Sequence, residues 1–211
     1  MKLTDKMIER TQKLVEYDKN ITKEYKVFCG IDEAGRGPLA GPVVVASCIM
    51  PLEDDKVVYG VYDSKKISEK VREELFEKIK TNAISYSIQQ VDQTTIDEIN
   101  ILQATKLGMK NAIECLSLKP ELALVDAVTN IDSNVDQVAI IKGDATSYSI
   151  ACASILAKVY RDRLMLKYDE EYKEYGFAKH KGYGTSEHIK VLKEQGPCKI
   201  HRKSFIKNFM R

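Results

Sequence analysis

GIDEAGRGPLAGP, residues 30–42, follows a short apolar run and places two adjacent carboxylates, Asp32 and Glu33, beside an arginine between glycines. A strand followed by glycines is also how a dinucleotide-binding fingerprint begins, where backbone amides approach a pyrophosphate. Here the two carboxylates occupy that approach, and carboxylates repel phosphate unless a metal cation lies between them. The stretch therefore predicts a strand that leads into an acidic site where phosphate binding requires a cation.

Composition predicts one soluble domain with a short appendage. The chain has 211 residues, of which 44% are hydrophobic and 30% charged, values typical of a globular protein that buries a core. Its longest apolar run, residues 43–50, is the length of a strand and too short to span a membrane. The N-terminus lacks the features of a signal peptide. The five cysteines are scattered without a C-x-x-C motif, which favours a reduced cytoplasmic protein with no membrane contact.

Charge is distributed unevenly along the chain. Residues 158–211 contain 14 Lys and Arg against 7 Asp and Glu, whereas the remaining residues are net acidic. A basic C-terminal third is typical of a protein that binds a phosphate backbone. A solvated basic surface explains the charge equally well.

Apolar periodicity predicts alternating helices and strands. The expected helices cover residues 5–16, 68–80, 95–116, 147–166 and 187–194, and the expected strands cover 26–32, 42–50, 83–91, 122–126 and 137–142. Thr4 and Ser68 are candidate N-caps, and Thr95 to Glu98 has the pattern of a capping box. Residues 176–185 are expected to form a loop. The order indicates an α/β fold on a mixed sheet.

Three acidic residues stand out by their context. Asp32 and Asp126 are expected at the ends of strands, and Asp144 precedes the long helix. Carboxylates at the carboxyl ends of strands line the functional crevice of an open α/β sheet and can converge on Mg²⁺. Asp144 has an alternative role as a helix cap. Glu33 shares a site with Asp32 only if the strand ends or twists there, because neighbouring side chains on a strand point to opposite faces.

Six blocks of the sequence closely resemble bacterial ribonuclease HII. They are GIDEAGRGPLAGPV from residue 30, DSKK at 63–66, LVDA at 124–127, KGDATSYSIACASILAKVYRD from 142, HKGYGT from 180 and HRKSF at 201–205. The blocks appear in the order of the family and cover residues 26–205. The sister family, ribonuclease HIII, lacks the GRG tripeptide and has an extra N-terminal domain, so Arg36 and the short N-terminal helix disfavour it.

The resemblance implies a fold and a set of functional residues. It implies a ribonuclease H-like catalytic domain over residues 26–211, with a mixed five-stranded sheet, helices on both faces and a basic, helical C-terminal part. The first 25 residues lie outside the resemblance, and their apolar spacing predicts an N-terminal amphipathic helix over residues 1–25. The implied catalytic and metal-binding residues are Asp32, Glu33, Asp126 and Asp144. The implied substrate-binding residues are Gly35, Arg36 and Gly37, whose backbone surrounds a ribonucleotide 2′-hydroxyl, Tyr183, which senses the same hydroxyl, and Lys65 or Lys66, which contacts phosphate.

The resemblance also implies an activity. The expected enzyme is a cytoplasmic, monomeric endoribonuclease that cleaves the RNA strand of RNA/DNA hybrids and cuts 5′ of single ribonucleotides in duplex DNA, as in ribonucleotide excision repair. Its expected cofactor is Mg²⁺ or Mn²⁺. Two such cations, held by carboxylates, can activate a water and stabilise the leaving 3′-oxygen. The expected product ends are a 5′-phosphate and a 3′-hydroxyl.

Simpler interpretations remain for several residues. Arg36 can be an ion-pair partner of Glu33, Tyr183 a plain loop aromatic, and Lys158 with Asp162 an ordinary i,i+4 pair. The three histidines, His180, His188 and His201, have a spacing that fits no zinc site and are expected to be surface or structural residues. For the whole chain, the competing functions are a non-catalytic nucleic-acid-binding module and a metal-dependent phosphomonoesterase.

Overall fold

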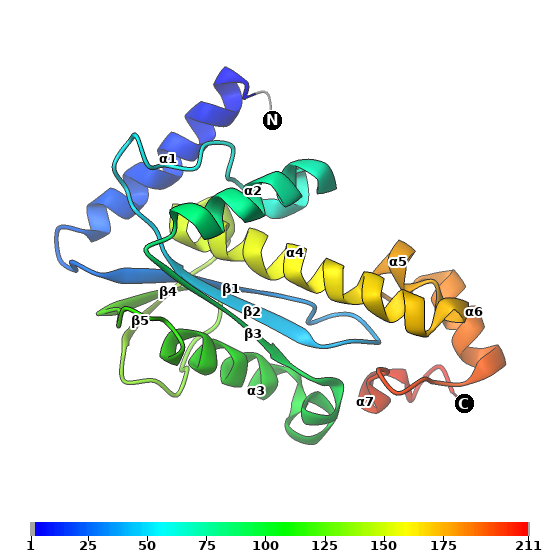
Figure 1. Cartoon of the computed structure of the whole chain (residues 1–211). Helices are drawn as coiled ribbons and strands as arrows, with labels where there is room; N and C mark the ends of the chain where they lie inside the picture. Colours follow the sequence, from blue (N-terminus) through cyan, green and yellow to red (C-terminus); the bar gives the residue numbers. More distant parts are fainter. Residues whose placement is uncertain (1–2, 211) are drawn as a thin grey trace.

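A mixed five-stranded sheet organises the protein, as predicted (Figure 1). The computed structural model describes residues 3–210, apart from the side chain of Lys65. The strands are β1 (Phe28–Ala34), β2 (Val43–Ile49), β3 (Ser85–Val91), β4 (Leu122–Asp126) and β5 (Asp136–Ile140), in the order β3-β2-β1-β4-β5. The β1–β2 and β2–β3 pairs are antiparallel, whereas β1–β4 and β4–β5 are parallel. The carboxyl ends of β1 and β4 therefore lie side by side at one edge of the sheet.

Helices cover both faces of this sheet (Figure 1). The large ones are α1 (Asp5–Ile21), α2 (Glu69–Asn82), α3 (Gln93–Glu114) and α4 (Tyr148–Glu171). Alternation along β2 explains the two layers, because successive side chains of a strand point to opposite faces. Val44 and Ala46 are buried in the core with residues of α2 and α4, whereas Val45 and Ile49 are buried with residues of α3.

The amino end of α4 lies directly against β1. A Cβ on Gly30 would be only 2.1 Å from the carbonyl carbon of Ser149, so only glycine allows this approach. Ser147 caps the helix, and its hydroxyl accepts from the amide of Ile150 at 3.3 Å. From α1, the buried carboxylate of Asp18 accepts from the amide and the hydroxyl of Ser149 at 2.8 and 2.7 Å. Strand β1 and helix α1 therefore hold this helix end.

Several predicted boundaries were wrong. Helix α1 extends to Ile21, and β1 continues two residues beyond Asp32. The capping box at Thr95 is incorrect: α3 begins at Gln93, and Asp92 accepts from the amide of Thr95 at 2.8 Å. The box fails because the helix begins earlier, with Asp92 as its N-cap. Asp97, inside the expected box, accepts from the amides of residues 203 and 204, at 2.7 and 2.9 Å. Such a contact between distant segments cannot be predicted from a local pattern.

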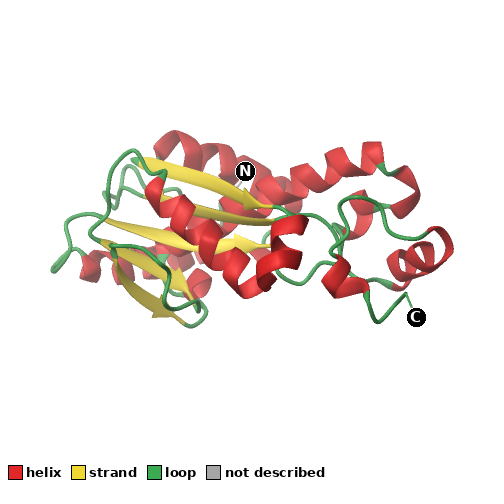
Figure 2. Ribbon diagram, turned by 90° about the horizontal axis from the view of Figure 1, so that it is seen from below, coloured by secondary structure: helices red, strands yellow, loops and turns green. Residues whose placement is uncertain are grey.

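The C-terminal part gathers beyond one end of the sheet (Figure 2). It consists of the last turns of α4, followed by η3 (Lys173–Tyr175), α5 (Phe177–His180), α6 (Ser186–Gln195) and α7 (Lys203–Ile206). Helix α5 lies inside the segment predicted as a loop, and α7 was not predicted. Two further short turns, η1 (Ser64–Lys66) and η2 (Gly143–Ala145), carry other predicted site residues. No helix within residues 3–210 is long and apolar enough to cross a membrane.

Candidate active site

A pocket of about 370 Å³ lies at the carboxyl ends of β1 and β4. This edge is where α/β sheets form their functional crevices. The pocket is lined by Asp32, Glu33, Ala34, Gly35, Arg36, Gly37, Ser64, Asp126, Ser154, Lys158, Arg161 and Tyr183. Segments that are far apart in the sequence therefore meet around three carboxylates.

The carboxylates of β1 and β4 interact electrostatically. Ile31 pairs with Val125 in the parallel ladder, so Asp32 and Asp126 follow at the same level of adjacent strands. The pKa of Asp32 is raised well above its usual range, first by burial and then by the nearby charges of Glu33 and Asp126. Such a cluster of like charges is unfavourable without a counter-charge.

Asp126 and Asp144 are connected through one peptide unit. The amide of Gly143 donates to Asp126 Oδ1 at 2.7 Å, and Asp144 follows directly in the turn η2. Asp144 is buried beside the pocket but is not among the described residues that line it. Its position after the hydrogen-bonded glycine places its backbone next to Asp126.

The donor chemistry of the pocket fits hard divalent cations. Asp32, Glu33 and Asp126 supply carboxylate oxygens, which are the preferred protein ligands of Mg²⁺ and Mn²⁺. Over residues 3–210, no three His, Cys, Asp or Glu side chains form a ready coordination cage. Mg²⁺ usually binds through one or two carboxylates together with waters and substrate phosphates. An open carboxylate pocket of this kind therefore suits a cation whose coordination is completed by a phosphodiester.

The glycine-rich segment and Tyr183 form the other side of the pocket. A Cβ on Gly37 would be 3.7 Å from Tyr183 Cε1, so the tyrosine ring lies beside this glycine. Tyr183 is nearly half exposed, which leaves much of its side chain accessible. Arg36 forms an ion pair with Glu33, with 3.6 Å between Nη1 and Oε1. The ion pair considered as an alternative role for Arg36 is therefore present, and the GRG tripeptide also lines the pocket.

Lys66 of the DSKK block does not line the carboxylate pocket. Lys66 Nζ is 2.9 Å from Asp63 Oδ2, and Lys66 lines a neighbouring cavity of about 220 Å³ together with Arg10 and Lys13. The prediction for the side chain of Lys65 lies outside the described atoms. Among the described side chains of this block, only that of Ser64 lines the carboxylate pocket. Any phosphate contact of Lys66 is therefore made beside the pocket and not inside it.

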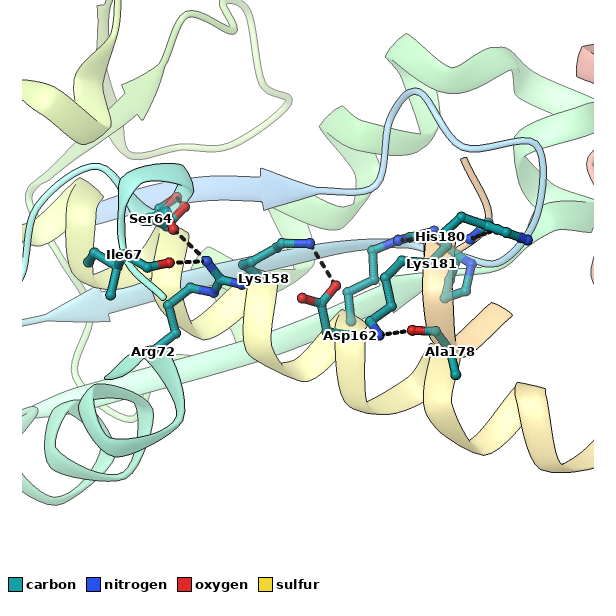
Figure 3. A network of polar contacts seen from close by, with 12 residues as sticks. Ser64, Ile67, Arg72, Lys158, Asp162, Ala178, His180 and Lys181 are labelled. Atoms are coloured by element: carbon teal, nitrogen blue, oxygen red, sulfur yellow. Dashed lines mark hydrogen bonds and ion pairs between the residues drawn. The ribbon is translucent and has the colours of Figure 1, made fainter. Parts of the chain in front are cut away.

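Lys158 was missed as a pocket residue. It forms the predicted i,i+4 pair with Asp162, with 2.7 Å between Nζ and Oδ1, and it also lines the pocket (Figure 3). Ser64 and Ser154 line the pocket as well, and their hydroxyls are 3.0 Å apart. In the sequence the regular i,i+4 spacing indicated only an ordinary surface pair.

Two buried arginines were also missed. The guanidinium of Arg161 donates to the carbonyls of Ala40, Pro42 and Lys181 at 3.1, 3.0 and 2.9 Å. Arg202 donates to the carbonyls of Gly35, Arg36 and Gly41 at 2.6, 2.8 and 2.9 Å. Both side chains are almost completely buried. Arginine is rarely buried in this way, and no sequence pattern distinguishes these two from surface arginines.

The three histidines are buried in one cluster behind Tyr183. All of their ring nitrogens have hydrogen-bond partners: Tyr175 O and Gly182 N for His180, Tyr183 O and His201 Nε2 for His188, and Cys198 N for His201 Nδ1. The structural interpretation of these residues is therefore confirmed, whereas a surface location was wrong. Their nitrogens are used to hold loops.

Comparisons with known proteins give a consistent result. The sequence model of the family described as Ribonuclease HII matches residues 29–208. Ribonuclease HII of Caldicellulosiruptor saccharolyticus is 57% identical over 197 residues, covering 93% of this chain and 95% of the relative. Ribonuclease HII of Clostridioides difficile is 53% identical over 188 residues, covering 89% of this chain and 73% of the relative.

Solved structures agree with the sequence relatives. The ribonuclease H2 of Pyrococcus horikoshii matches with a TM-score of 0.73 and 27% identity, over 87% of this chain and 97% of that one. The RNase HII of Archaeoglobus fulgidus, solved in a complex with PCNA, matches with a TM-score of 0.73 and 32% identity, over 87% and 97% of the two chains. The fold is thus the ribonuclease H-like α/β fold that the sequence predicted. The chain belongs to the ribonuclease HII family, which consists of endoribonucleases of the ribonuclease H type.

Proposed function

We propose that this protein is a divalent-metal-dependent endoribonuclease that cuts the RNA strand of RNA/DNA hybrids and cuts 5′ of single ribonucleotides embedded in duplex DNA. The products would carry a 3′-hydroxyl and a 5′-phosphate, with the ribonucleotide on the 5′-phosphate side. Family membership supports action on RNA/DNA substrates. The finer parts, namely the single-ribonucleotide cut and the roles of individual residues, rest on the geometry of the pocket.

One observation carries the proposal: carboxylates and a candidate 2′-hydroxyl reader line the same pocket. Asp32 and Glu33 lie near the end of β1, and Gly35 to Gly37 follow without interruption. Tyr183 closes this side from the C-terminal part. The 2′-hydroxyl is the group that distinguishes RNA from DNA at a given nucleotide. The missing side chain of Gly37 leaves room beside the Tyr183 ring for a sugar to approach the backbone closely, whereas the corresponding space at Gly35 is filled by Arg161.

The chemistry follows from the groups that line the pocket. Two divalent cations bound by the carboxylates would supply activation of a water and stabilisation of the leaving 3′-oxygen. Asp32, Glu33 and Asp126 would hold these cations, and Asp144 would contribute beside Asp126. Tyr183 and the GRG backbone would orient the ribonucleotide so that the phosphodiester on its 5′ side faces the carboxylates. Positioning of this kind supplies a large part of the rate enhancement of an enzyme.

Binding of the duplex itself is assigned to phosphate contacts. The basic residues of the C-terminal third, together with Lys158 at the pocket wall, would bind the backbone without regard to sequence. Affinity that rests on phosphate contacts falls steeply as salt concentration rises. Recognition of the ribonucleotide and affinity for the duplex are therefore separable properties.

The decisive experiment maps the cut on a duplex that contains one ribonucleotide in one DNA strand. With Mg²⁺ or Mn²⁺ we expect a single cut on the 5′ side of the ribonucleotide, and no cut in the all-DNA duplex. Binding without cleavage under every cation condition would show a nucleic-acid-binding module. Release of phosphate from a free nucleotide, with the duplex left intact, would show a phosphomonoesterase. Either result would contradict the proposal.

A further inference from the structure

A C-terminal segment joins the glycine-rich segment from the other end of the chain. The amide of Gly41 donates to the carbonyl of Ile200 at 2.9 Å, and the amide of Arg202 donates to the carbonyl of Leu39 at 2.8 Å. Residues Ala40 and His201 thereby form an isolated antiparallel bridge. The dipeptide His201–Arg202 is held rigidly beside the GRG tripeptide, and both of its side chains are buried.

Arg202 holds the GRG tripeptide by its backbone. Its Nη2 and Nη1 donate to the carbonyls of Gly35 and Arg36 at 2.6 and 2.8 Å, and its Nε donates to the carbonyl of Gly41. Burial, followed by the nearby charge of Arg161, lowers the pKa of Arg202 to about 9. The guanidinium therefore stays charged at neutral pH. Three donors in a rigid plane satisfy three carbonyls, which an ammonium group cannot do.

His201 holds Tyr183 through a second histidine. The carbonyl of Tyr183 can only accept, so His188 must carry its proton on Nδ1, which lies 2.9 Å from this oxygen. His188 Nε2 then accepts from His201 Nε2, also at 2.9 Å. His201 Nδ1 remains an acceptor and receives the amide of Cys198 at 3.0 Å. This chain of hydrogen bonds, the relay from His201 through His188 to the carbonyl of Tyr183, is complete only when both imidazoles are neutral.

A neighbouring contact keeps the same loop in place. His180 Nδ1 accepts from the amide of Gly182, and Arg161 donates to the carbonyl of Lys181. Figure 3 shows His180 and Lys181 beside α4, with the Lys181 ammonium directed to the carbonyl of Ala178. The backbone on the amino side of Tyr183 is thus fixed independently, while its own carbonyl accepts from His188, at the end of the chain of hydrogen bonds from His201, and from the amide of Thr185 at 2.8 Å.

We propose that His201 and Arg202 are positioning residues for ribonucleotide recognition, because one dipeptide holds the GRG backbone through Arg202 and Tyr183 through His201. This inference rests on the proposed function of the same pocket. The dipeptide then contributes to the distance between the GRG tripeptide and Tyr183, together with Arg161, which donates to carbonyls of both segments, and with the bond from the amide of Leu39 to the carbonyl of Gly182 at 2.8 Å. A duplex with one ribonucleotide offers one 2′-hydroxyl. Displacement of Tyr183 or of the GRG tripeptide therefore lowers kcat/KM on this substrate in full. A long hybrid offers a 2′-hydroxyl at every step and is less sensitive to the displacement.

The test compares kcat/KM on a single-ribonucleotide duplex with kcat/KM on a long RNA/DNA hybrid. Arg202→Lys keeps the charge but loses the planar fork, and we expect the ratio of the two values to fall at least about tenfold, since small misplacements can cost far more. His201→Phe keeps a ring and loses the bonds to His188 and to the amide of Cys198. Only the bond to His188 leads to Tyr183, so we expect the ratio to fall about threefold to tenfold, the value of one hydrogen bond. His201→Gln offers an amide donor in place of Nε2 and should restore part of the ratio.

A matched control is Arg163→Lys, since Arg163 lies on α4 and pairs with Glu73 and Glu77 on α2, away from the pocket. It should leave the ratio unchanged. Equal losses on both substrates in the Arg202 and His201 variants would mean that the dipeptide only supports the fold, and the inference would be wrong. The absence of any loss of kcat/KM on either substrate would contradict the inference as well. If Arg202→Lys does not fold, His201→Phe decides alone.

The outcome for the unaltered protein separates this inference from the proposed function. If that protein does not cut 5′ of a single ribonucleotide, the proposed function is wrong and the inference falls with it. If it cuts as expected and only the selective loss is missing, the inference alone is wrong.

Discussion

His201 allows the neutral state of the relay to be measured as a change in stability. Burial, together with the neighbouring His188, lowers the pKa of His201 from 6.5 to about 4. The folded protein therefore excludes a proton that the unfolded chain binds, so the stabilisation is complete above pH 6.5 and is lost as the pH falls toward 4. At about 1.36 kcal/mol per pKa unit, the free energy of unfolding should lose roughly 3 kcal/mol from this one group.

Other groups titrate in the same pH range. The contribution of His201 must therefore be measured as a difference in unfolding free energy between the unaltered protein and a His201 variant. Burial raises the pKa of Asp18 to about 6, which acts in the opposite direction, because that stabilisation is present at low pH and is lost as the pH rises. Urea unfolding of the unaltered protein and of His201→Phe, at about pH 7.5 and about pH 4, cancels the contribution of Asp18. The variant should be less stable than the unaltered protein near pH 7.5. This difference in unfolding free energy should be smaller by about 3 kcal/mol near pH 4. A gap that does not change with pH would show that His201 titrates normally, and the neutral relay would be refuted.

Four further predictions follow from the pocket and the buried acids. Asp126→Asn should abolish cleavage and leave the metal-free melting temperature equal or higher, because it removes a charge that opposes Asp32; near-normal turnover would mean that the metal site is misplaced. Millimolar Mg²⁺ should raise the melting temperature slightly by mass action, and a chelator should stop cleavage reversibly; unfolding on chelation would point to a structural metal. Tyr183→Phe should lower kcat/KM by up to about tenfold, the value of one hydrogen bond, and Tyr183→Ala should cost more, mainly on single-ribonucleotide duplexes; equal losses on long hybrids would remove Tyr183 from the reader. Asp18→Asn should gain stability at pH 8 relative to pH 4, by about 3 kcal/mol, in urea titrations; a gain independent of pH would show that Asp18 is ionised normally.

The strands and the acidic residues were accessible from the sequence because their signals are local. A run of apolar residues that ends in a carboxylate predicts a buried strand with a functional end, and β4 begins and ends where the pattern predicted, at Leu122 and Asp126. The end of β1 was harder to place, because Glu33 and Ala34 continue the strand into the site. Alternation alone would direct Asp32 and Glu33 apart, yet both line the pocket.

The framework behind the pocket was not predictable, because its contacts are long-range and use residue types that are usually exposed. Arg202 lies 166 residues from Arg36 in the sequence, and Arg161 lies 121 residues from Ala40. Neither helical periodicity nor a short motif encodes such pairs. The histidines show the same difficulty, because spacing argues against a metal site but cannot predict that His188 and His201 hydrogen-bond to each other.

The cost of burying two guanidinium groups is itself informative about the site. A buried charge is often no more stabilising than a well-packed apolar side chain of similar volume. The pKa of Arg202 is lowered first by burial and then by repulsion from Arg161. What apolar side chains cannot do is satisfy the carbonyls that the turn from Gly35 to Pro42 directs inward, and an unsatisfied buried carbonyl would be costly. The outer side of this turn, at Gly35 to Gly37, lines the pocket beside Asp32 and Glu33. The arginines therefore stabilise the backbone conformation on which the proposed recognition of a sugar depends. For this reason the C-terminal part is a component of the pocket and cannot be regarded as an appendage to the sheet.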